Sequence, residues 1–347
     1  MRNPLAEDLD HVLARTTDLW RELRGARVFM TGGTGFFGSW LLETLLWAND
    51  RLSLDASIVV LTRDADAFHR KAPRLAGHPS LTLVSGDVRT FELDGAFSHI
   101  VHAATDSSAV DPSIVFDTIV AGTRRTLELA RRTRATRFLL TSSGAVYGRQ
   151  PPDVTHVPEE YVGAPDPANA VHAYAEGKRA AEMLCALYAD ARLQPTIARC
   201  FAFVGPYLPV DAHFAIGNFI RDALDGGPIR ILGDGTPYRS YLYAADLAIW
   251  LWTILLRGRP MRPYNVGSEE AISIADLANL IARRFTTNPA VRIARSAVAG
   301  VVPERYVPST KRARTDLGLA VTVNLDEALT RTVEWHRRRV MSPHVGN

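Results

Sequence analysis

Cysteine is scarce in this sequence, with Cys185 and Cys200 the only two among 347 residues. A disulfide framework is therefore excluded, and neither their spacing nor their neighbours predict a metal site, so we expect two buried apolar thiols. Long apolar runs are also missing: none approaches the roughly 20 residues that a membrane-spanning helix needs. The N-terminus has no basic segment followed by an apolar one, so we expect no secretory signal, no membrane partner and a cytoplasmic protein.

A strong excess of charge of one sign is missing as well. The chain carries 40 Lys and Arg against 37 Asp and Glu, a net charge of +3, which argues against a general nucleic-acid or membrane-surface role but leaves room for a basic pocket. With 47% hydrophobic and 22% charged residues, the composition is that of a globular protein rather than a disordered or collagen-like one. The length allows a large core in one or two lobes.

The first half of the chain alternates between predicted strands and helices. An amphipathic pattern over residues 7–24 predicts a helix that packs on the fold or on a partner. We expect strands at 27–31, 57–62, 81–84, 98–102, 136–141 and 194–199, and helices at 36–48, 113–133 and 172–191. This alternation predicts a Rossmann-type, doubly wound parallel sheet with helices on both faces.

After about residue 200 the pattern loosens and Gly and Pro accumulate. Helices are expected near 213–225, 244–257 and 273–285, with a late strand at 261–266. We therefore expect an N-terminal helix (1–25), a dinucleotide-binding domain (26–200) and a smaller α/β substrate-binding lobe (201–347) interwoven with the Rossmann sheet.

The clearest motif is the segment TGGTGFFG at residues 31–38, between a predicted strand and a predicted helix. Gly32 suits a tight turn, Gly35 lets the backbone approach a pyrophosphate, and Gly38 lets the helix lie close to the strand. The free N–H groups at the start of the helix, at Phe36 and Phe37, would stabilise the phosphates. This context predicts a dinucleotide cofactor.

The end of the second strand reports which dinucleotide binds. An acid there would accept hydrogen bonds from the ribose hydroxyls, whereas an arginine suits a 2′-phosphate. Here the strand ends in Thr62 and Arg63, so NADP(H) is favoured, and Asp64 keeps NAD(H) possible. Asp87 and Val88 follow the third strand, where an acid can bind the adenine amino group.

Tyr174 and Lys178 form the candidate catalytic pair. Their four-residue spacing places a phenol and an ammonium on one face of a helix. A nearby cation stabilises phenolate and lowers the pKa of the tyrosine toward a useful range. Ser143 ends the strand at 136–141, at the sheet edge where ligands bind in this architecture, and can orient a substrate hydroxyl or carbonyl.

Together these motifs resemble the extended short-chain dehydrogenase/reductases, the NAD-dependent epimerases and dehydratases that modify nucleotide sugars. The resemblance covers residues 26–335 and includes, beyond the motifs above, His102-Ala103-Ala104, Ala121-Gly122-Thr123, Tyr147-Gly148, Arg199 to Pro206, Gly233 to Arg239 and Tyr264 to Gly267. It implies a nucleotide-diphosphate sugar substrate and a homodimer that pairs through the helices at 113–133 and 172–191.

The resemblance also assigns roles to single residues. It makes Tyr174 the acid–base, Lys178 its tuner and a ribose ligand, and Ser143 the hydroxyl that orients the substrate. Arg239 matches an arginine that binds the diphosphate, a role that its charge suits. Arg305 is a second candidate for that role, with a surface arginine as the alternative. Ala103 and Ala104 join the cofactor-binding set.

The sequence departs from the family pattern beside Ser143. The family's dehydratases carry an Asp-Glu pair at the positions of Gly144 and Ala145, and its decarboxylases carry a Glu there, although residues 174–179 look most like the decarboxylase version. Without those acids, elimination and decarboxylation are disfavoured. Ala202 replaces a usual phosphate-binding Asn, for which Asn218 or a backbone N–H is a candidate substitute. Ser240 replaces a usual Asp.

These features predict an oxidoreductase acting at C4 of a nucleotide-diphosphate sugar. The first expectation is NADPH-dependent reduction of a 4-keto-6-deoxy sugar, with Tyr174 as the acid. The alternative is a 4-epimerase with tightly bound NAD. A 4,6-dehydratase or decarboxylase ranks below both, and a nucleotide-binding scaffold without catalysis ranks last because Ser143, Tyr174 and Lys178 are intact.

Overall fold

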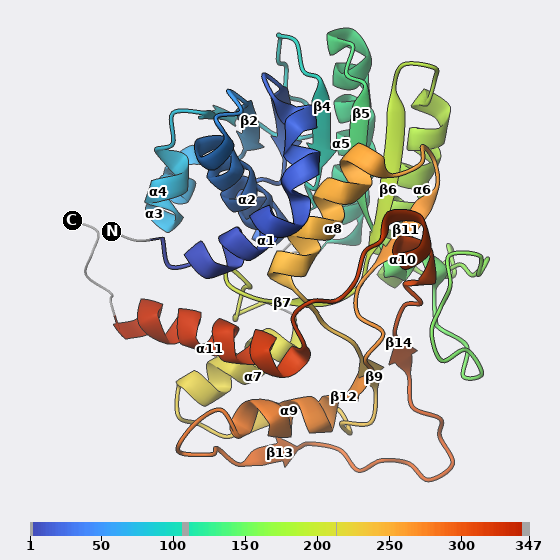
Figure 1. Ribbon diagram of the computed structural model, residues 1–347. Helices are drawn as coiled ribbons and strands as arrows, with labels where there is room; N and C mark the ends of the chain where they lie inside the picture. Colours follow the sequence, from blue (N-terminus) through green and yellow to red (C-terminus); the bar gives the residue numbers. More distant parts are fainter. Residues whose placement is uncertain (1–2, 106–110, 213, 342–347) are drawn as a thin grey trace.

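A computed structural model describes residues 3–105, 111–212 and 214–341 (Figure 1). Its centre is a seven-stranded sheet in the order β3-β2-β1-β4-β5-β6-β11, in which every pair of neighbours is parallel. The strands are β1 (Arg27–Thr31), β2 (Ser57–Thr62), β3 (Leu81–Ser85), β4 (His99–His102), β5 (Arg137–Ser143), β6 (Gln194–Cys200) and β11 (Pro263–Val266). The predicted Rossmann-type sheet is confirmed.

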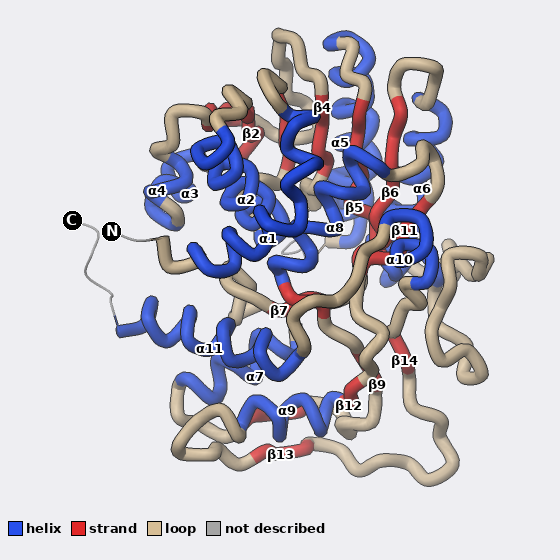
Figure 2. Tube along the Cα trace, in the orientation of Figure 1, coloured by secondary structure: helices blue, strands red, loops and turns tan. Residues whose placement is uncertain are grey.

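Helices cover both faces of this sheet (Figures 1 and 2). The helices α1 (Ala6–Trp20), α2 (Phe36–Leu52) and α8 (Ala244–Arg257) lie on one face, and α5 (Pro112–Thr133) and α6 (Ala173–Tyr188) lie on the other. Val28 and Met30 of β1 belong to the core under the first face, while Phe29 belongs to the core under the second. Burial on both faces explains why the strand is apolar without alternation.

The order of the strands creates a site at one sheet edge. The chain runs outward from β1 to β3 and then crosses back to place β4 on the other side of β1. Ligands in open α/β sheets bind at the carboxyl ends of the strands where the order reverses. The glycine segment after β1 and Ala103 after β4 lie at this point.

The remaining elements form smaller layers below the sheet in Figure 1. A three-stranded sheet contains β12 (Ile272–Ser273), β9 (Tyr238–Arg239) and β14 (Arg305–Tyr306), and two strand pairs join β7 (Phe203–Val204) to β10 (Leu242–Tyr243) and β8 (Ile229–Ile231) to β13 (Val291–Ile293). Helices α7 (Ala215–Leu224), α9 (Ile274–Ala282) and α11 (Leu325–Met341) accompany them. The helix α8 and the strand β11 follow residue 201 in the chain but belong to the layers of the Rossmann sheet. The predicted boundaries of the domains stay a prediction.

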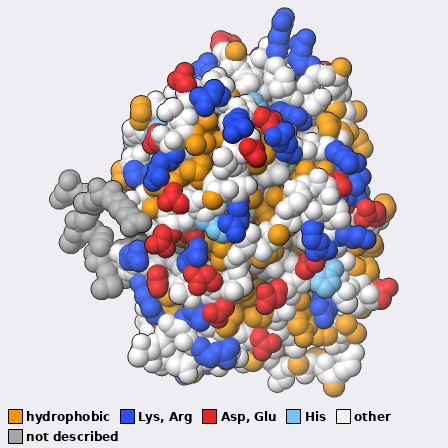
Figure 3. Space-filling view, in the orientation of Figure 1, with side chains coloured by type: hydrophobic (Ala, Val, Ile, Leu, Met, Phe, Trp, Pro, Cys, Tyr) orange, Lys and Arg blue, Asp and Glu red, His pale blue; other side chains and the backbone are white. Residues whose placement is uncertain are grey.

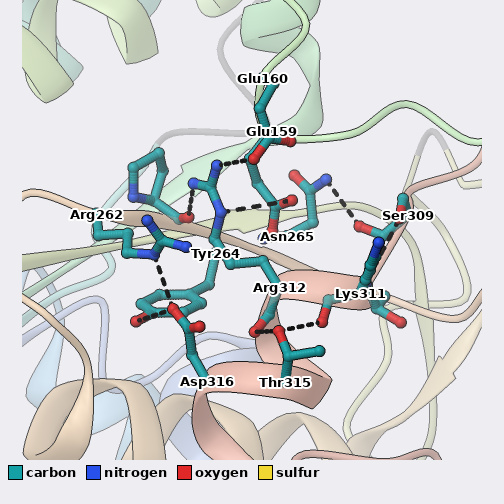
Figure 4. A network of polar contacts seen from close by, with 12 residues as sticks. Glu159, Glu160, Arg262, Tyr264, Asn265, Ser309, Lys311, Arg312, Thr315 and Asp316 are labelled. Carbon is teal, nitrogen blue, oxygen red and sulfur yellow. Dashed lines mark hydrogen bonds and ion pairs between the residues drawn. The ribbon is translucent and has the colours of Figure 1, made fainter.

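A network of polar contacts fixes helix α10 (Lys311–Leu317) to the edge strand β11 (Figure 4). Arg312 donates to the Glu160 carboxylate at 2.6 Å and to the backbone oxygen of Pro263 at 2.8 Å. Asn265 donates to the backbone oxygen of Ser309 at 3.0 Å. These bonds cover the open edge of the parallel sheet, which would otherwise expose unpaired backbone groups.

The N-terminal helix α1 is part of the core. Trp20 is fully buried and meets Trp252 of α8 edge to face, with ring centroids 5.5 Å apart. Asp8 is also buried and accepts a hydrogen bond from the Tyr243 hydroxyl at 2.6 Å and from Arg331 of α11 at 2.5 Å. The helix predicted at 7–24 therefore packs on the fold itself.

Charged side chains of both signs are interspersed over the face shown in Figure 3, as a nearly neutral chain predicts. Within the described ranges, no helix combines the length and the apolar character needed to cross a bilayer. Periodicity missed the short helices α3 (Ala65–Lys71) and α4 (Pro73–Ala76), as well as α10 and α11.

Replacing Trp20 with alanine tests whether α1 stabilises the fold. Deleting a fully buried aromatic ring leaves a cavity, so we expect Trp20→Ala to lower the free energy of unfolding by about 3–5 kcal/mol. Urea titration followed by circular dichroism measures this change. Arg21→Ala is the matched control, because the Arg21 side chain is 76% exposed; equal stability of the two variants would contradict the packing.

Candidate active site

The glycine segment after β1 has the geometry of a dinucleotide loop. Gly32 has φ of +71°, and a Cβ atom there would lie 2.5 Å from the carbonyl carbon of Ala103. A Cβ atom on Gly38 would lie 2.3 Å from the Cα atom of Gly33. Only glycine fits at both positions, because the first needs the left-handed region and the second a close approach of helix to turn.

Helix α2 begins directly after this loop. Gly35 is its N-cap, and the first turn contains no acidic residue. The N–H groups of Phe36, Phe37 and Gly38 have no acceptor within the helix, which makes this helix end a ready site for an anion. The structure thus brings together the glycine-loop residues predicted to bind the pyrophosphate.

His102 forms a hydrogen bond with Thr31 at the start of the glycine segment and is not an acid–base candidate. It is buried, and its ring nitrogens are 2.8 Å from the Thr31 hydroxyl and 3.0 Å from the Thr123 hydroxyl. Burial, aided by the Lys178 charge, lowers the pKa of His102 to about 3. The imidazole is therefore neutral and structural.

The adenosine end of the cofactor site carries two predicted acids and one arginine. Asp64 caps helix α3, because its carboxylate accepts from the backbone N–H of Ala67 at 2.8 Å. Asp87 forms an ion pair with Arg89 at 2.7 Å, and this hydrogen-bonded pairing lowers the pKa of Asp87 to about 2. Arg63 follows β2 and is exposed at the same edge.

Lys178 lies at the centre of the catalytic residues. Its side chain is 3% exposed, and its ammonium donates to the Thr105 hydroxyl at 2.9 Å and to the backbone oxygen of Thr141 at 2.8 Å. Burial lowers the pKa of Lys178 to about 8, against the raising influence of Cys200 and Glu182. Both acceptors are neutral oxygens, so within the described residues no carboxylate accepts a hydrogen bond from this buried ammonium.

Tyr174 stands one helical turn before Lys178, whose ammonium is 5.8 Å from the centre of the tyrosine ring. Tyr174 is 37% exposed. Partial burial raises the pKa of Tyr174, while the neighbouring Ser143 hydroxyl lowers it. The Ser143 oxygen also accepts from the backbone N–H of Ala145 at 3.1 Å. The structure therefore brings the predicted trio Ser143, Tyr174 and Lys178 together.

A partly buried ion pair fixes the helix that carries Tyr174 and Lys178. Glu182 of α6 accepts from the Ser142 hydroxyl at 2.5 Å and pairs with Arg199 of β6 at 2.7 Å. Ser142 precedes the catalytic serine on β5, so α6 is fixed to two strands at the level of the site. Such a pair sets geometry more than it adds stability.

The predicted diphosphate arginines lie on neighbouring strands of the small sheet. Tyr306 is in register with Arg239, and Arg305 is in register with Tyr238. Side chains in register share a face, and consecutive residues alternate. Arg239 thus lies with Tyr306, at 5.9 Å from its ring centre, whereas Arg305 lies over Tyr238 at 4.3 Å on the opposite face.

Arg239 and Arg305 therefore differ in their relation to the site. Arg239 pairs with Glu304 at 2.9 Å, so a bound diphosphate would share or replace this acid. Asn218 lies on the second turn of α7, and within the described residues no hydrogen bond joins it to Arg239 or Ser143. Ser240, at the usual Asp position, is buried and its hydroxyl has no hydrogen-bond partner among the described residues.

Aromatic side chains occupy the space beside Gly144. A Cβ atom there would lie 2.7 Å from the Phe201 ring and 2.8 Å from the Tyr306 hydroxyl. Phe201 and Tyr306 contact each other, with ring centroids 4.7 Å apart. The sequence shows that no acid is present at this position, but it did not predict that the rings of Phe201 and Tyr306 occupy the space.

Sequence reasoning missed three residues of the site. Thr105 accepts a hydrogen bond from Lys178, Tyr306 of the distant strand β14 lies beside Gly144, and Cys200 lies near both Lys178 and Tyr306. Burial raises the pKa of the Cys200 thiol to about 12, so it is an inert thiol there. Within the described ranges, no group of three or more potential ligands could hold a metal ion.

A protein-family model, described as the NAD dependent epimerase/dehydratase family, matches residues 28–267 of this chain. The chain belongs to this family. A UDP-glucuronic acid decarboxylase 1 from Xenopus tropicalis is 30% identical and aligns over 90% of this chain and 73% of its own. A UDP-glucuronic acid decarboxylase 3 from Arabidopsis thaliana is 31% identical over 91% of both chains.

Solved structures of the epimerase/dehydratase family share the fold. A dTDP-glucose 4,6-dehydratase from Streptomyces venezuelae, solved with NAD bound, is 26% identical with a TM-score of 0.76, over 91% of this chain and 98% of the other. A UDP-glucose 4-epimerase from Thermotoga maritima is 21% identical with a TM-score of 0.74, over 90% and 99% of the two chains. The predicted family and fold class are confirmed.

The pKa of Lys178 predicts a pH dependence of dinucleotide binding. The family resemblance makes Lys178 a ribose ligand; in that role its protonated ammonium would donate hydrogen bonds, and it loses its proton as the pH rises through about 8. We therefore expect NADH affinity to weaken severalfold between about pH 7 and pH 9. In Lys178→Arg, affinity stays level over this range, because a guanidinium keeps its charge. NADH fluorescence titration measures both; the same weakening in both proteins would contradict the role of Lys178.

Proposed function

We propose that this protein exchanges a hydride at C4 of a nucleotide-diphosphate sugar and returns it to the other face, as a 4-epimerase does. The observation that carries the proposal is the set Ser143, Tyr174 and Lys178 at the switch point, beside a space that contains aromatic rings in place of an acid. These three residues can transfer a proton and stabilise an oxyanion, and Gly144 and Ala145 beside them supply no second acid–base pair.

Each residue has a defined part in this chemistry. A bound nicotinamide dinucleotide would supply the hydride acceptor, held by the glycine loop and by Lys178. Tyr174, as phenolate, accepts the proton of the C4 hydroxyl and later returns it. Lys178 stabilises the phenolate by its charge, and Ser143 donates a hydrogen bond to the reacting oxygen. Arg239 is the candidate ligand for the diphosphate.

The NADPH-dependent reduction predicted from the sequence uses the same residues. The relatives and structures named above are decarboxylases, a dehydratase and an epimerase, and none is a reductase. Elimination of water needs an acid–base pair near C5 and C6, which Gly144 and Ala145 cannot supply. We therefore propose epimerisation, in which the hydride returns to the same sugar, ahead of reduction and of elimination.

Decarboxylation is the second candidate, because relatives with that name are 30–31% identical over at least 90% of this chain. A ketone at C4 activates a carboxylate on C5 toward loss of carbon dioxide. This step needs stabilisation of the developing C4 oxyanion, for which Ser143 and Tyr174 suffice. It does not strictly require the acid that is missing at Ala145.

A panel of nucleotide sugars separates these outcomes. The purified protein is incubated with UDP-, dTDP-, GDP- and CDP-linked sugars, including UDP-glucuronic acid and a 4-keto-6-deoxy sugar, and products are identified by mass spectrometry and NMR. We expect a C4 epimer without net change in the nicotinamide absorbance. Release of carbon dioxide would support decarboxylation, and stoichiometric oxidation of NADPH would support the reductase. No conversion of any sugar would overturn the proposal.

Tyr174→Phe tests the acid–base role. Because a positioned proton donor contributes about 10²–10⁴-fold, we expect turnover to fall by at least that factor. Dinucleotide affinity should stay within about twofold, since the ring and Lys178 remain. Full activity in the variant would contradict the mechanism. Tyr188→Phe, at the distal end of the same helix, is the matched control.

For the cofactor, we propose NADP(H) in preference to NAD(H). Arg63 is exposed directly after β2, at the position where an arginine suits a 2′-phosphate, and the neighbouring Asp64 is engaged as a helix cap. The solved relative with NAD bound is the argument for the alternative.

Arg63→Ala tests this preference. Losing a charged hydrogen bond should weaken NADPH binding about 10-fold or more and leave NADH binding nearly unchanged. Isothermal titration of both cofactors gives the ratio. Arg192→Ala removes an equal charge beside the amino end of β6 and should change neither affinity. An unchanged ratio in Arg63→Ala would show that Arg63 does not contact the 2′-phosphate.

We also propose a homodimer through α5 and α6. Ile114, Met183 and Leu187 on these helices are 43%, 61% and 65% exposed, which leaves apolar surface for a second copy. Analytical ultracentrifugation of the purified protein decides this, and a monomer at micromolar concentration would refute it.

A further inference from the structure

Lys71 connects the helix after β2 to the glycine segment after β1. It is the last residue of α3, and its ammonium donates a hydrogen bond to the backbone oxygen of Thr34 at 2.8 Å. Thr34 belongs to the glycine segment at residues 31–38. The sequence did not indicate this contact, because the two residues are 37 positions apart.

The part of the glycine segment that Lys71 contacts lies toward β2. A Cβ atom on Gly33 would lie 2.6 Å from the side chain of Val60 of β2. Thr34 follows Gly33 directly, so it lies on the same side of the segment. In dinucleotide-binding sheets the adenosine ribose lies between the glycine loop and the end of the second strand. The Lys71 ammonium is therefore at the ribose end of the cofactor site.

Helix α3 explains how Lys71 reaches this place. Arg63 stands directly after β2, and Asp64 caps the helix by accepting a hydrogen bond from the backbone N–H of Ala67 at 2.8 Å. The seven residues of α3 span about 10 Å. The side chain of Lys71 then returns from the far end of the helix to Thr34. Two cations, Arg63 and Lys71, thus border the space between the end of β2 and the glycine segment.

We propose that Lys71 is a specificity-determining residue that binds the 2′-phosphate of NADP(H) together with Arg63. This inference rests on the proposed preference for NADP(H). A phosphate monoester carries about −1.5 to −2 charges at neutral pH, so a single arginine leaves part of this charge unbalanced. An ammonium has three donors, so Lys71 can keep its bond to Thr34 and still donate to a phosphate oxygen.

A purely structural role for Lys71 has a different consequence. If Lys71 only fastened α3 to the glycine segment, its loss would weaken every ligand of that segment alike. A contact with the 2′-phosphate instead affects only ligands that carry this group. The pair 2′,5′-ADP and 5′-AMP separates the two roles, because these ligands share the adenosine and the 5′-phosphate and differ in the 2′-phosphate alone.

Lys71→Met tests the proposal, because it keeps most of the apolar stem and removes the charge. The dissociation constants of 2′,5′-ADP and 5′-AMP are measured by isothermal titration of the whole protein at one fixed ionic strength. We expect Lys71→Met to bind 2′,5′-ADP about 10-fold more weakly and 5′-AMP within about twofold of the unmodified protein. An equal loss for both ligands, or no loss for either, overturns the proposal.

Two further variants show whether the effect belongs to this side chain. Lys71→Arg keeps the charge and should keep most of the preference for 2′,5′-ADP; a loss as large as in Lys71→Met would overturn the proposal. Arg70→Met is the matched control, because Arg70 is exposed on the same helix. It should change neither constant. The same loss in Arg70→Met as in Lys71→Met would show an effect of net charge and overturn the proposal.

The unmodified protein separates this inference from the cofactor proposal. If it binds 2′,5′-ADP no more tightly than 5′-AMP, the preference for NADP(H) fails and this inference fails with it. If it prefers 2′,5′-ADP and Lys71→Met keeps that preference in full, the cofactor proposal stands and only the role of Lys71 fails. These titrations need no sugar, so they are readable whatever the panel of nucleotide sugars gives.

Discussion

The site depends on one buried positive charge. Lys178 is almost inaccessible, yet among the described residues its ammonium donates hydrogen bonds to two neutral oxygens and to no carboxylate. An uncompensated buried cation is unfavourable unless an anion or a strongly polar ligand approaches it. In the proposed function, Tyr174 phenolate and the hydroxyls of a bound ribose would be that partner. In that proposal, the buried ammonium would stabilise the reactive phenolate form of Tyr174 before the reaction begins, which is how preorganised sites lower barriers.

The position of the Lys178 ammonium depends on how the helices on the two faces are held against the sheet. On one face, Glu182 joins α6 to β5 and β6 at the height of the catalytic residues. On the other, Glu43 of α2 is 1% exposed and accepts from Asn3 near the N-terminus and from Tyr207 beyond β7. The helix whose first turn would bind the pyrophosphate therefore also joins the N-terminal segment to the segment after β7.

Sequence reasoning predicted the parts of the molecule that local patterns determine. The strand–helix alternation, the glycine loop and the Tyr174–Lys178 spacing each depend on neighbours within a few residues, and the structure agrees with their placement. The short strands β9 and β14 have two residues each, too few to show a period.

Long-range pairing explains what sequence reasoning could not predict. Tyr306 lies beside Gly144 because β14 pairs with β9, and nothing in the sequence around residue 306 indicates that register. The same register separates Arg239 from Arg305, which the sequence alone could not place on different faces. Alternation along a strand puts them on opposite faces.

The space beside Gly144 connects the chemistry to the family. Removal of a C4 hydride yields a ketone that acidifies the neighbouring C5 position, so epimerisation, elimination and decarboxylation share a first step. The groups that surround C5 and C6 decide which second step the ketone undergoes. Here the rings of Phe201 and Tyr306 fill the space beside Gly144, and a side chain at residue 144 would displace them. An acid could therefore not be restored by substitution at Gly144 alone, because Phe201 and Tyr306 would have to move as well.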